Sequence, residues 1–316
     1  MKSWACKTFY SFVRTFKLKW ISIISMFFAF IGGAFTISEI LNNVFNSTVG
    51  FDFMRKYTIE GIILFIIICI VINWEPLTFS CFLENADTKI TICVCNIFSQ
   101  KGALVIPTNT TFDTSMEDEF ISIKSIQGQY QKRYYNNAIS TLNNELDLAL
   151  ADKSYEILQD NRKTKIKRYE IGTTCKISKG LQHSYFLAVA DINKYGKTEN
   201  VTLEKITTAL VALWQNLNEI GHVETLRIPI IGTGRAGLKN ASREKIIQEI
   251  IFSFVSTARE MKVTENLVIC IHPSDFANKN LNWDNLCEFL KYTCKYQIPK
   301  QESLEGHPEK DMIHSN

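Results

Sequence analysis

The stretch TLRIPIIGTGRAGL, residues 225–238, joins an apolar run to a cluster of glycines. The run 225–231 is rich in apolar residues throughout and predicts a strand that is covered on both faces. Gly232, Gly234 and Gly237 follow at once, where the strand ends and where α/β sheets place their ligand crevice. Glycines there let backbone N–H groups approach phosphate oxygens, so the stretch predicts an α/β sheet with an anion-binding loop.

Amphipathic helices flank this strand on both sides. Apolar residues recur at three- and four-residue spacing from Leu203 to Ile220, and the pattern stops at Gly221, a residue typical of helix ends. A second such pattern follows Ser242, which predicts a helix capped by that serine, and the apolar run 266–272 predicts another buried strand. Helices that alternate with buried strands predict a three-layer α/β/α domain with a mixed sheet.

The segments around this core complete the predicted domain. Short apolar runs bounded by polar residues predict strands at 88–96, 102–109 and 184–193, with one more within 162–177. The region 126–151 is helix-prone, and a last helix is expected at 282–296. For the basic run between Arg162 and Arg168 we expect a solvated hairpin, with contact to anionic lipid headgroups as the alternative.

Two long apolar runs lie near the N-terminus. The run 20–37 is eighteen residues without a charge, about the length that crosses a hydrocarbon core of roughly 30 Å. The run 61–74 reaches that length only if it starts near Tyr57 and places Glu60 in the interfacial zone, with Tyr57 and Trp74 as aromatic anchors. A signal peptide is the alternative for the first run, and a buried strand or core helix for the second. We expect two transmembrane helices ahead of the α/β domain.

Basic residues set the expected orientation. Five lysines and arginines precede the first run, and basic flanks stay in the cytoplasm. With two spans both termini are then cytoplasmic, although Arg55 and Lys56 in the outer loop count against this orientation. The expected parts are a basic N-terminal segment 1–19, a transmembrane hairpin 20–74, a linker 75–87, the α/β domain 88–298 and a polar, disordered tail 299–316.

Composition argues against several classes of protein. The chain of 316 residues is 46% hydrophobic and 21% charged with a net charge of +3, which points neither to a nucleic-acid-binding protein nor to a disordered one. Nine cysteines, an odd number without a C-x-x-C pair, fit a reducing compartment better than a disulfide framework. Cys93 and Cys95 point the same way on an expected strand and, without nearby histidines, favour core packing over a metal site. We therefore expect no metal and no cofactor.

Two nucleotide-binding motifs do not fit the glycine loop. A Rossmann fingerprint opens a helix directly and has an acidic residue about twenty residues further on. Here residues 238–242 delay the helix, and His272 and Pro273 stand where the acid should be. A Walker loop needs a lysine where Leu238 stands. A tight turn without a ligand remains the alternative to an anion site.

The domain resembles a macro domain, the α/β/α module that binds ADP-ribose and its derivatives. ITICVCNIF…GALVIPTN is similar to the opening of that family, and RIPIIGTGRAG to its late phosphate loop. The resemblance covers about 88–298. It implies that Asn96 takes the place of the aspartate that binds the adenine amino group and that Asn109 lies near the distal ribose. It places the diphosphate on Gly232, Thr233, Gly234, Arg235, Ala236 and Gly237.

The chain also departs from that family. Asn96 offers an acceptor to adenine but no charge. The glycine-rich early loop of hydrolytic macro domains is replaced by NTTFDT…SIQGQY, in which Gly128 is the lone glycine. The resemblance therefore implies binding without turnover, with an ADP-ribosyl hydrolase as the alternative, in which Asn109 and Asp113 orient a water. Asp113 has a second interpretation, an Asx-type turn after Phe112.

Two apolar spans followed by such a domain resemble the transmembrane–macro effectors of the Thoeris anti-phage defence systems. That resemblance implies a bacterial inner-membrane protein and a partner TIR-domain enzyme, which converts NAD into a signal such as ADP-ribose conjugated to histidine. Signal binding would drive homo-oligomerisation and membrane disruption or cell death, and Gly32-Gly33 offers a place where helices can meet closely. A passive membrane-anchored scaffold is the remaining alternative.

Overall fold

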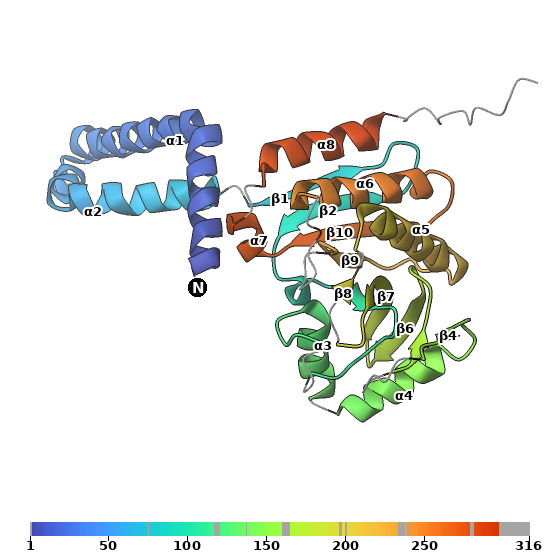
Figure 1. Ribbon diagram of the computed structural model, residues 1–316. Helices are drawn as coiled ribbons and strands as arrows, with labels where there is room; N and C mark the ends of the chain where they lie inside the picture. The colour runs from blue at the N-terminus through green and yellow to red at the C-terminus, as the bar shows by residue number, and fades with distance from the viewer. Residues whose placement is uncertain are drawn as a thin grey trace, which may run out of the picture.

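The computed structural model describes residues 2–74, 76–116, 121–136, 138–159, 165–195, 198–199, 201–232, 238, 241–278 and 281–296. Figure 1 shows an α/β domain from which a pair of long helices projects. The pair comes from the N-terminal part of the chain, and the strands that the structure describes all belong to the domain.

The domain is built on one mixed sheet, as the sequence predicts. Its strands lie in the order β1-β2-β10-β9-β3-β7-β6, with the short β8 paired to β7. The central strands β2, β10, β9, β3 and β7 are parallel, while β1 and β6 run antiparallel at the two edges. The bounds are Thr78–Phe82 (β1), Lys89–Val94 (β2), Ala103–Asn109 (β3), Thr174–Lys179 (β6), Gln182–Ile192 (β7), Thr198–Glu199 (β8), Leu226–Pro229 (β9) and Asn266–Ile271 (β10).

A separate two-stranded ladder stands apart from the main sheet. It joins β4 (Glu156–Ile157) to β5 (Lys167–Arg168) in antiparallel register. The expected basic hairpin is therefore confirmed for the residues that the structure describes, while residues 160–164 between the two strands lie outside them.

Helices cover both faces of the main sheet and complete the three predicted layers (Figure 1). The helices on one face are α5 (Leu203–Glu219), α6 (Arg243–Ala258) and α8 (Trp283–Lys295), and those on the other are α3 (Ile126–Tyr135) and α4 (Ile139–Ala149). Side chains along β7 alternate between the two cores, with Tyr185 and Leu187 on the α5 side and Phe186 and Ala188 on the α3 side. All four are fully buried, so the central strand is covered on both faces.

Local capping signals set the helix ends. Ser242 accepts a hydrogen bond from the backbone N–H of Lys245 at 3.1 Å, which confirms the predicted cap of α6. Within the expected helical region 126–151 the structure has two helices, because Asn136 adopts a left-handed conformation with φ 42° and ends the first.

Several short elements are not indicated by the sequence patterns, and three of them lie beside the strands that lead to the binding end. β1 lies inside the expected linker 75–87, so that prediction is wrong at 78–82. Residues of β1 are only partly buried and show no clear alternation; pairing with β2 orders them, in register from Thr78 opposite Cys93. The other two, the 3-10 turn η1 (Ile97–Ser99) and the short helix α7 (Pro273–Asn278), follow the ends of β2 and β10.

An antiparallel pair, α1 (Lys2–Phe45) and α2 (Val49–Ile72), precedes the sheet. Phe30 of α1 stacks on Phe65 of α2, with ring centroids 4.3 Å apart. The expected N-terminal segment 1–19 stays a prediction as a separate part; it is helical, since α1 already begins at its second residue. No glycine or proline interrupts the chain between that residue and the first apolar run, so nothing local stops the helix.

The two helices differ in how well they fit a membrane span. Among the described residues one helix, Lys7–Phe45, is long and apolar enough to cross a membrane, and 6% of its apolar window is buried. The apolar part of α2, Ile59–Ile72, is shorter. The backbone of α2 leaves helical geometry at Tyr57, where the second span was expected to start. Length and composition thus support a span for α1, and the second span stays a prediction.

The first part of α1 contacts the domain at α7 and α8. Tyr10 meets Phe276 edge to face, with ring centroids 5.1 Å apart, and Phe276 lies 6.2 Å from Trp283 on its other side. Arg14 forms an ion pair with Asp284 at the start of α8. The long N-terminal helix is therefore attached to the domain through α7.

A buried arginine ties the middle of the sheet together. Arg227 of β9 is 1% exposed. Its guanidinium donates to the carbonyl oxygens of Ile97 at 2.9 Å and Gln100 at 2.5 Å, to that of Gly102, and to Oε1 of Gln182 at 2.8 Å. One side chain thus joins β9 to the turn after β2, the start of β3 and the start of β7, and satisfies acceptors that are buried or partly buried.

We expect Arg227→Met to destabilise the domain strongly. A buried acceptor left without a partner costs about 1–3 kcal/mol, and several acceptors lose theirs. The thermal unfolding midpoint of the full chain in detergent should fall by roughly 10 °C. Arg168→Met is the control, since Arg168 is half exposed and its ion pair with Glu156 lies at the surface, where such pairs contribute little. Equal midpoints for the two variants would contradict this role of Arg227.

Candidate functional site

A cavity of about 640 Å³ lies where the parallel strands β3, β9 and β10 end. Its volume is in the range of small-molecule sites, and its position at the carboxyl ends of parallel strands is where α/β sheets bind ligands. Three parts of the chain line it: the ends of the strands, the start of α3, and α7. The lining residues are Pro107, Ile123, Lys124, Ser125, Ile126, Gln129, Pro229, Ile230, Gly232, His272, Ser274 and Asp275.

Gly232, the first residue of the predicted phosphate loop, lies in the cavity wall. Its φ of +74° is a conformation that residues with a side chain rarely adopt. A Cβ there would lie 2.5 Å from Cδ1 of Ile206. The backbone N–H of Leu238 donates to the carbonyl oxygen of Gly232 at 3.2 Å, so the ends of the loop are joined. The other predicted loop contacts lie outside the described residues: Thr233, Gly234, Arg235, Ala236 and Gly237.

The start of α3 forms the opposite side of the cavity. Ser125 caps this helix by accepting from the backbone N–H of Gly128 at 3.0 Å. A Cβ on Gly128 would lie 2.3 Å from the carbonyl oxygen of Ser122, so the lone glycine of this region allows close packing of two backbone segments. The N-terminal end of a helix carries a partial positive charge. Together with the loop that begins at Gly232, it makes the cavity suitable for an anion.

α7 and the residue before it form the third wall. Nδ1 of His272 lies 2.6 Å from Oγ of Ser274 and accepts from the Ser274 backbone N–H at 3.2 Å. Asp275 is held by Arg243 at the start of α6, with Nε 3.2 Å from Oδ1. His272 is named from the sequence only because it stands where a Rossmann fold has an acidic residue, and Ser274 and Asp275 are not singled out. Their place directly after a buried strand was the signal that could have marked them.

Asn96 lies at the end of β2 and caps the turn η1. Its Oδ1 accepts from the backbone N–H of Phe98 at 2.9 Å, and the side chain is half buried. It is not among the cavity-lining residues that the structure describes. Its proposed contact with adenine therefore stays a prediction, and the acceptor that it would offer already serves the turn.

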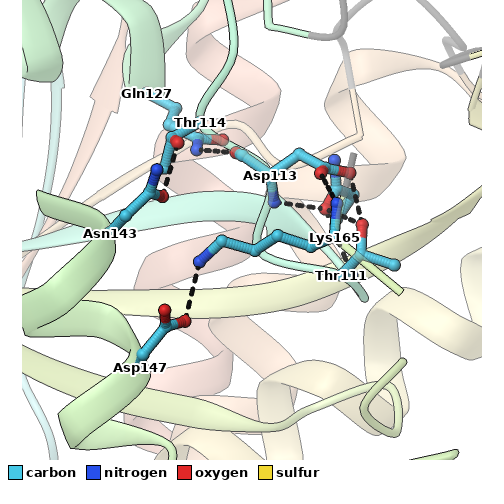
Figure 2. A network of polar contacts seen from close by, with 8 residues as sticks. Thr111, Asp113, Thr114, Gln127, Asn143, Asp147 and Lys165 are labelled. Carbon is cyan, nitrogen blue, oxygen red and sulfur yellow. Dashed lines mark hydrogen bonds and ion pairs between the residues drawn. The ribbon is translucent and has the colours of Figure 1, made fainter. Parts of the chain in front are cut away.

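Asn109 and Asp113 lie at the end of β3 and in the early loop, and Figure 2 shows Asp113 inside a polar network. Oδ1 of Asn109 accepts from the backbone N–H groups of Thr111 at 3.2 Å and Asp113 at 3.1 Å. The carboxylate of Asp113 accepts from the hydroxyl of Thr111 and from the backbone N–H of Lys165 at 3.2 Å. Asp113 is 1% exposed and Asn109 7% exposed. The Asx-type turn is thus made by Asn109, and both side chains fasten the loop.

Side chains from α3 and α4 enclose this loop (Figure 2). Nε2 of Gln127 donates to the carbonyl oxygen of Asp113 at 2.7 Å, and the hydroxyl of Thr114 donates to Oδ1 of Asn143 at 2.6 Å. Neither Asn109 nor Asp113 is among the residues that line the described cavity. The structure therefore brings Gly232 to the cavity and leaves the other described candidates at neighbouring strand ends.

A second cavity, of about 400 Å³, lies beside the β4–β5 ladder. Three of its charged residues already have partners, since Arg168 is 2.7 Å from Glu156 and Asp191 is 2.9 Å from Lys205. None of the residues predicted to bind the ligand lines it. The cavity at Gly232 is therefore the better candidate.

The cysteine pair on β2 is buried, as expected for core packing. Cys93 is 4% and Cys95 8% exposed, and the structure joins them by a disulfide, which the sequence did not lead us to expect. Side chains two residues apart on a strand point to the same face, which brings the two sulfur atoms together. The sulfur of Cys270 on the neighbouring strand lies within 4.8 Å of both.

Comparison with known proteins identifies the family of the domain. A family model described as the macro domain of Thoeris protein ThsA matches residues 90–272. Thoeris protein ThsA of Bacillus amyloliquefaciens (strain Y2) is 22% identical over 194 residues, which are 59% of this chain and 62% of that protein. The chain thus spans less than two thirds of the length of that relative.

Solved macrodomain structures are similar to the α/β domain in overall fold. The Oceanobacillus iheyensis macrodomain with ADP has a TM-score of 0.47 and 12% identity, over 68% of this chain and 96% of that one. A glycine-to-valine mutant of it with ADPR has a TM-score of 0.44 and 13% identity, over 68% and 97%. Because the family model covers more than half of the sequence, this chain belongs to the macro-domain family of Thoeris protein ThsA.

Proposed function

We propose that this chain is a membrane-anchored effector of a Thoeris anti-phage defence system. Its macro domain binds an ADP-ribose-type signal in the cavity at Gly232, and its N-terminal helices convert that binding into membrane damage. One observation carries the proposal: α7 is a wall of the cavity and is also the part of the domain that contacts α1.

The cavity suits a diphosphate joined to less polar groups. The helix start at Ser125 and the glycine loop that begins at Gly232 supply backbone donors for phosphate oxygens. Ile126, Pro229 and Ile230 add apolar surface of the kind that receives a base or a ribose. An ADP-ribose derivative combines these features, since its charged diphosphate is joined to a base and riboses that are less polar. We propose an amino-acid conjugate such as histidine-ADP-ribose, made by a TIR-domain enzyme, as the signal.

The path from the cavity to the membrane runs through one short helix. Ser274 and Asp275 face the cavity, and the next residue, Phe276, lies between Tyr10 of α1 and Trp283 of α8. Phe276 is 6% exposed, so α7 cannot move without repacking against α1. If a ligand binds one position of α7 more tightly than another, it shifts the equilibrium toward that position by the difference in binding free energy. Because α7 packs against α1, the position of α1 changes with it.

The membrane event requires several copies of the chain. Two helices per subunit are too few to line a pore, so we propose that binding drives homo-oligomerisation in the bacterial inner membrane, with both termini in the cytoplasm. A Cβ on Gly32 or Gly33 would meet no atom within 4 Å. These glycines thus offer an open small-residue surface, on which another membrane helix can approach closely.

The early loop supports binding without turnover. The carboxylate of Asp113 and the amide oxygen of Asn109 already accept hydrogen bonds within the loop and are buried. A general base needs a free lone pair within reach of a water on the substrate. We therefore propose a sensor rather than an ADP-ribosyl hydrolase.

Gly234→Asp should abolish ligand binding. A carboxylate in the phosphate loop repels the diphosphate, and we expect at least a tenfold loss of affinity, about 1.4 kcal/mol. Calorimetry of the full chain with ADP-ribose and histidine-ADP-ribose measures it, and toxicity in cells should be lost in parallel. Gly180→Asp is the matched control, because Gly180 lies in a surface turn with open space around it and aspartate tolerates its φ of +58°. Toxicity that survives the loss of binding would contradict ligand gating.

Tyr10→Ala combined with Arg14→Ala should separate binding from toxicity. The two changes remove the ring contact with Phe276 and the ion pair with Asp284 but leave the cavity intact. We expect ligand affinity within twofold of the original chain and a loss of toxicity. The control is Tyr195→Ala with Arg168→Ala, two exposed side chains away from α7. If toxicity is unchanged, the coupling does not run through this contact.

The chain should release no ADP-ribose from ADP-ribosylated protein. Asp113→Asn weakens the hydrogen bonds of the early loop, so the unfolding midpoint should fall by a few degrees without a change in ligand affinity. Chromatography of the reaction mixture detects free ADP-ribose, with a hydrolytic macro domain as the positive control. Product formation that disappears in Asp113→Asn would establish the hydrolase alternative instead.

A further inference from the structure

The first part of α1 buries polar side chains and exposes apolar ones, which is the reverse of a helix packed on a soluble domain. Ser11 and Thr15, 2% and 0% exposed, are buried on the side where α1 meets the domain. The large apolar side chains of the same segment are exposed: Phe9 67%, Phe12 37%, Val13 47%, Phe16 38% and Trp20 55%. A helix packed on a soluble domain buries its apolar side and exposes its polar one.

These five exposed apolar residues form one continuous stripe, and Leu18, which is 50% exposed, lies outside it. Their spacing of three and four residues places them on a single face of a helix with about 3.6 residues per turn. The same helical periodicity places Lys17 and Lys19 at opposite borders of that face, and both are exposed. We call Phe9, Phe12, Val13, Phe16 and Trp20 the aromatic stripe. An apolar face with lysines along both borders matches a helix that lies in a membrane surface.

The position of the first part of α1 in the structure fits a membrane surface. In Figure 1 the first part of α1 runs across the ends of the α1–α2 pair, between that pair and the domain, rather than along it. The pair is joined at this end by Ser22 and Asn73, whose Oγ and Oδ1 lie 3.2 Å apart. A pair that crosses the bilayer therefore brings the stripe to the level of the headgroups, where Trp and Lys side chains serve as anchors.

We propose that residues 7–20 of α1 form an interfacial helix whose aromatic stripe inserts into the cytoplasmic surface of a phospholipid bilayer. Lys17 and Lys19 contact anionic headgroups, and the opposite face carries Tyr10 and Arg14 to the domain. This inference rests on the membrane anchoring proposed above. It adds a second membrane contact, which holds α7 and the cavity beside the bilayer.

Depth-dependent fluorescence quenching tests the proposal on the full chain. The chain is placed in vesicles of phosphatidylethanolamine and phosphatidylglycerol, with Cys6 and Cys81 replaced by serine. A single new cysteine then carries a nitrobenzoxadiazole label, in place of Phe16 in the stripe, Phe28 in the span, or Leu181 in a surface turn. Leu181 is 100% and Phe28 67% exposed, so neither label disturbs packing. Lipids with a nitroxide near the headgroup or at the bilayer centre report the depth of each label.

The three labels give separate outcomes. We expect the label at Phe16 to be quenched at least twofold more by the shallow nitroxide than by the deep one, the label at Phe28 to show the reverse, and the label at Leu181 to be quenched by neither. If the Phe28 label is quenched by neither lipid, the membrane anchoring itself is wrong. If Phe28 behaves as expected and Phe16 is not quenched, only the interfacial helix is overturned, which includes the case in which a second copy of the chain covers the stripe.

A variant pair shows whether the stripe itself makes the contact. Phe9→Glu with Phe12→Glu should remove the shallow quenching of the Phe16 label, because two carboxylates on the stripe oppose insertion among anionic headgroups. Tyr292→Glu with Leu148→Glu changes two exposed apolar residues elsewhere and should leave the quenching unchanged. Retained quenching in the first pair would mean that the helix lies at the surface for another reason and would overturn the role of the stripe.

Discussion

The buried guanidinium of Arg227 is the interaction on which the geometry of the binding end depends. A charged group can stay inside a domain only if its donors are satisfied, and here backbone carbonyl oxygens and one side-chain amide do so. Those acceptors belong to the turn after β2, to the start of β3 and to β7. Because β9 itself leads to Gly232, the same side chain relates the glycine loop to the turn that carries Asn96.

The carboxyl ends of the parallel strands then divide into two regions with different roles. The ends of β3, β9 and β10 surround a cavity whose walls include two segments suited to an anion. The loop after β3 is closed by its own side chains, which leave Asp113 almost no exposure. The closed loop therefore lies beside an open cavity, and this arrangement supports the proposal of a sensor.

α7 connects this recognition site to the rest of the chain. It is 6 residues long, and consecutive residues face different surfaces: Ser274 and Asp275 lie at the cavity and Phe276 lies against α1. A short helix packed at such an interface is a suitable element to take two positions, because packed interfaces switch between discrete arrangements instead of deforming continuously. Tight packing of Phe276 between two aromatic rings gives such an interface.

The amino-acid sequence by itself determined the elements that local periodicity specifies. Apolar runs gave β9 and β10, helical spacing with a capping serine gave α6, and the glycine cluster placed a loop after the strand; these signals act between residues close in the chain. Only the tertiary structure decided that Asn109 and Asp113 fasten a loop, that β1 extends the sheet, that α7 closes the cavity and that the polar face of α1 meets the domain. These features depend on partners far apart in sequence, such as Arg14 and Asp284, 270 residues apart. A side chain in a loop or an edge strand takes its role from such partners, and no local pattern specifies them.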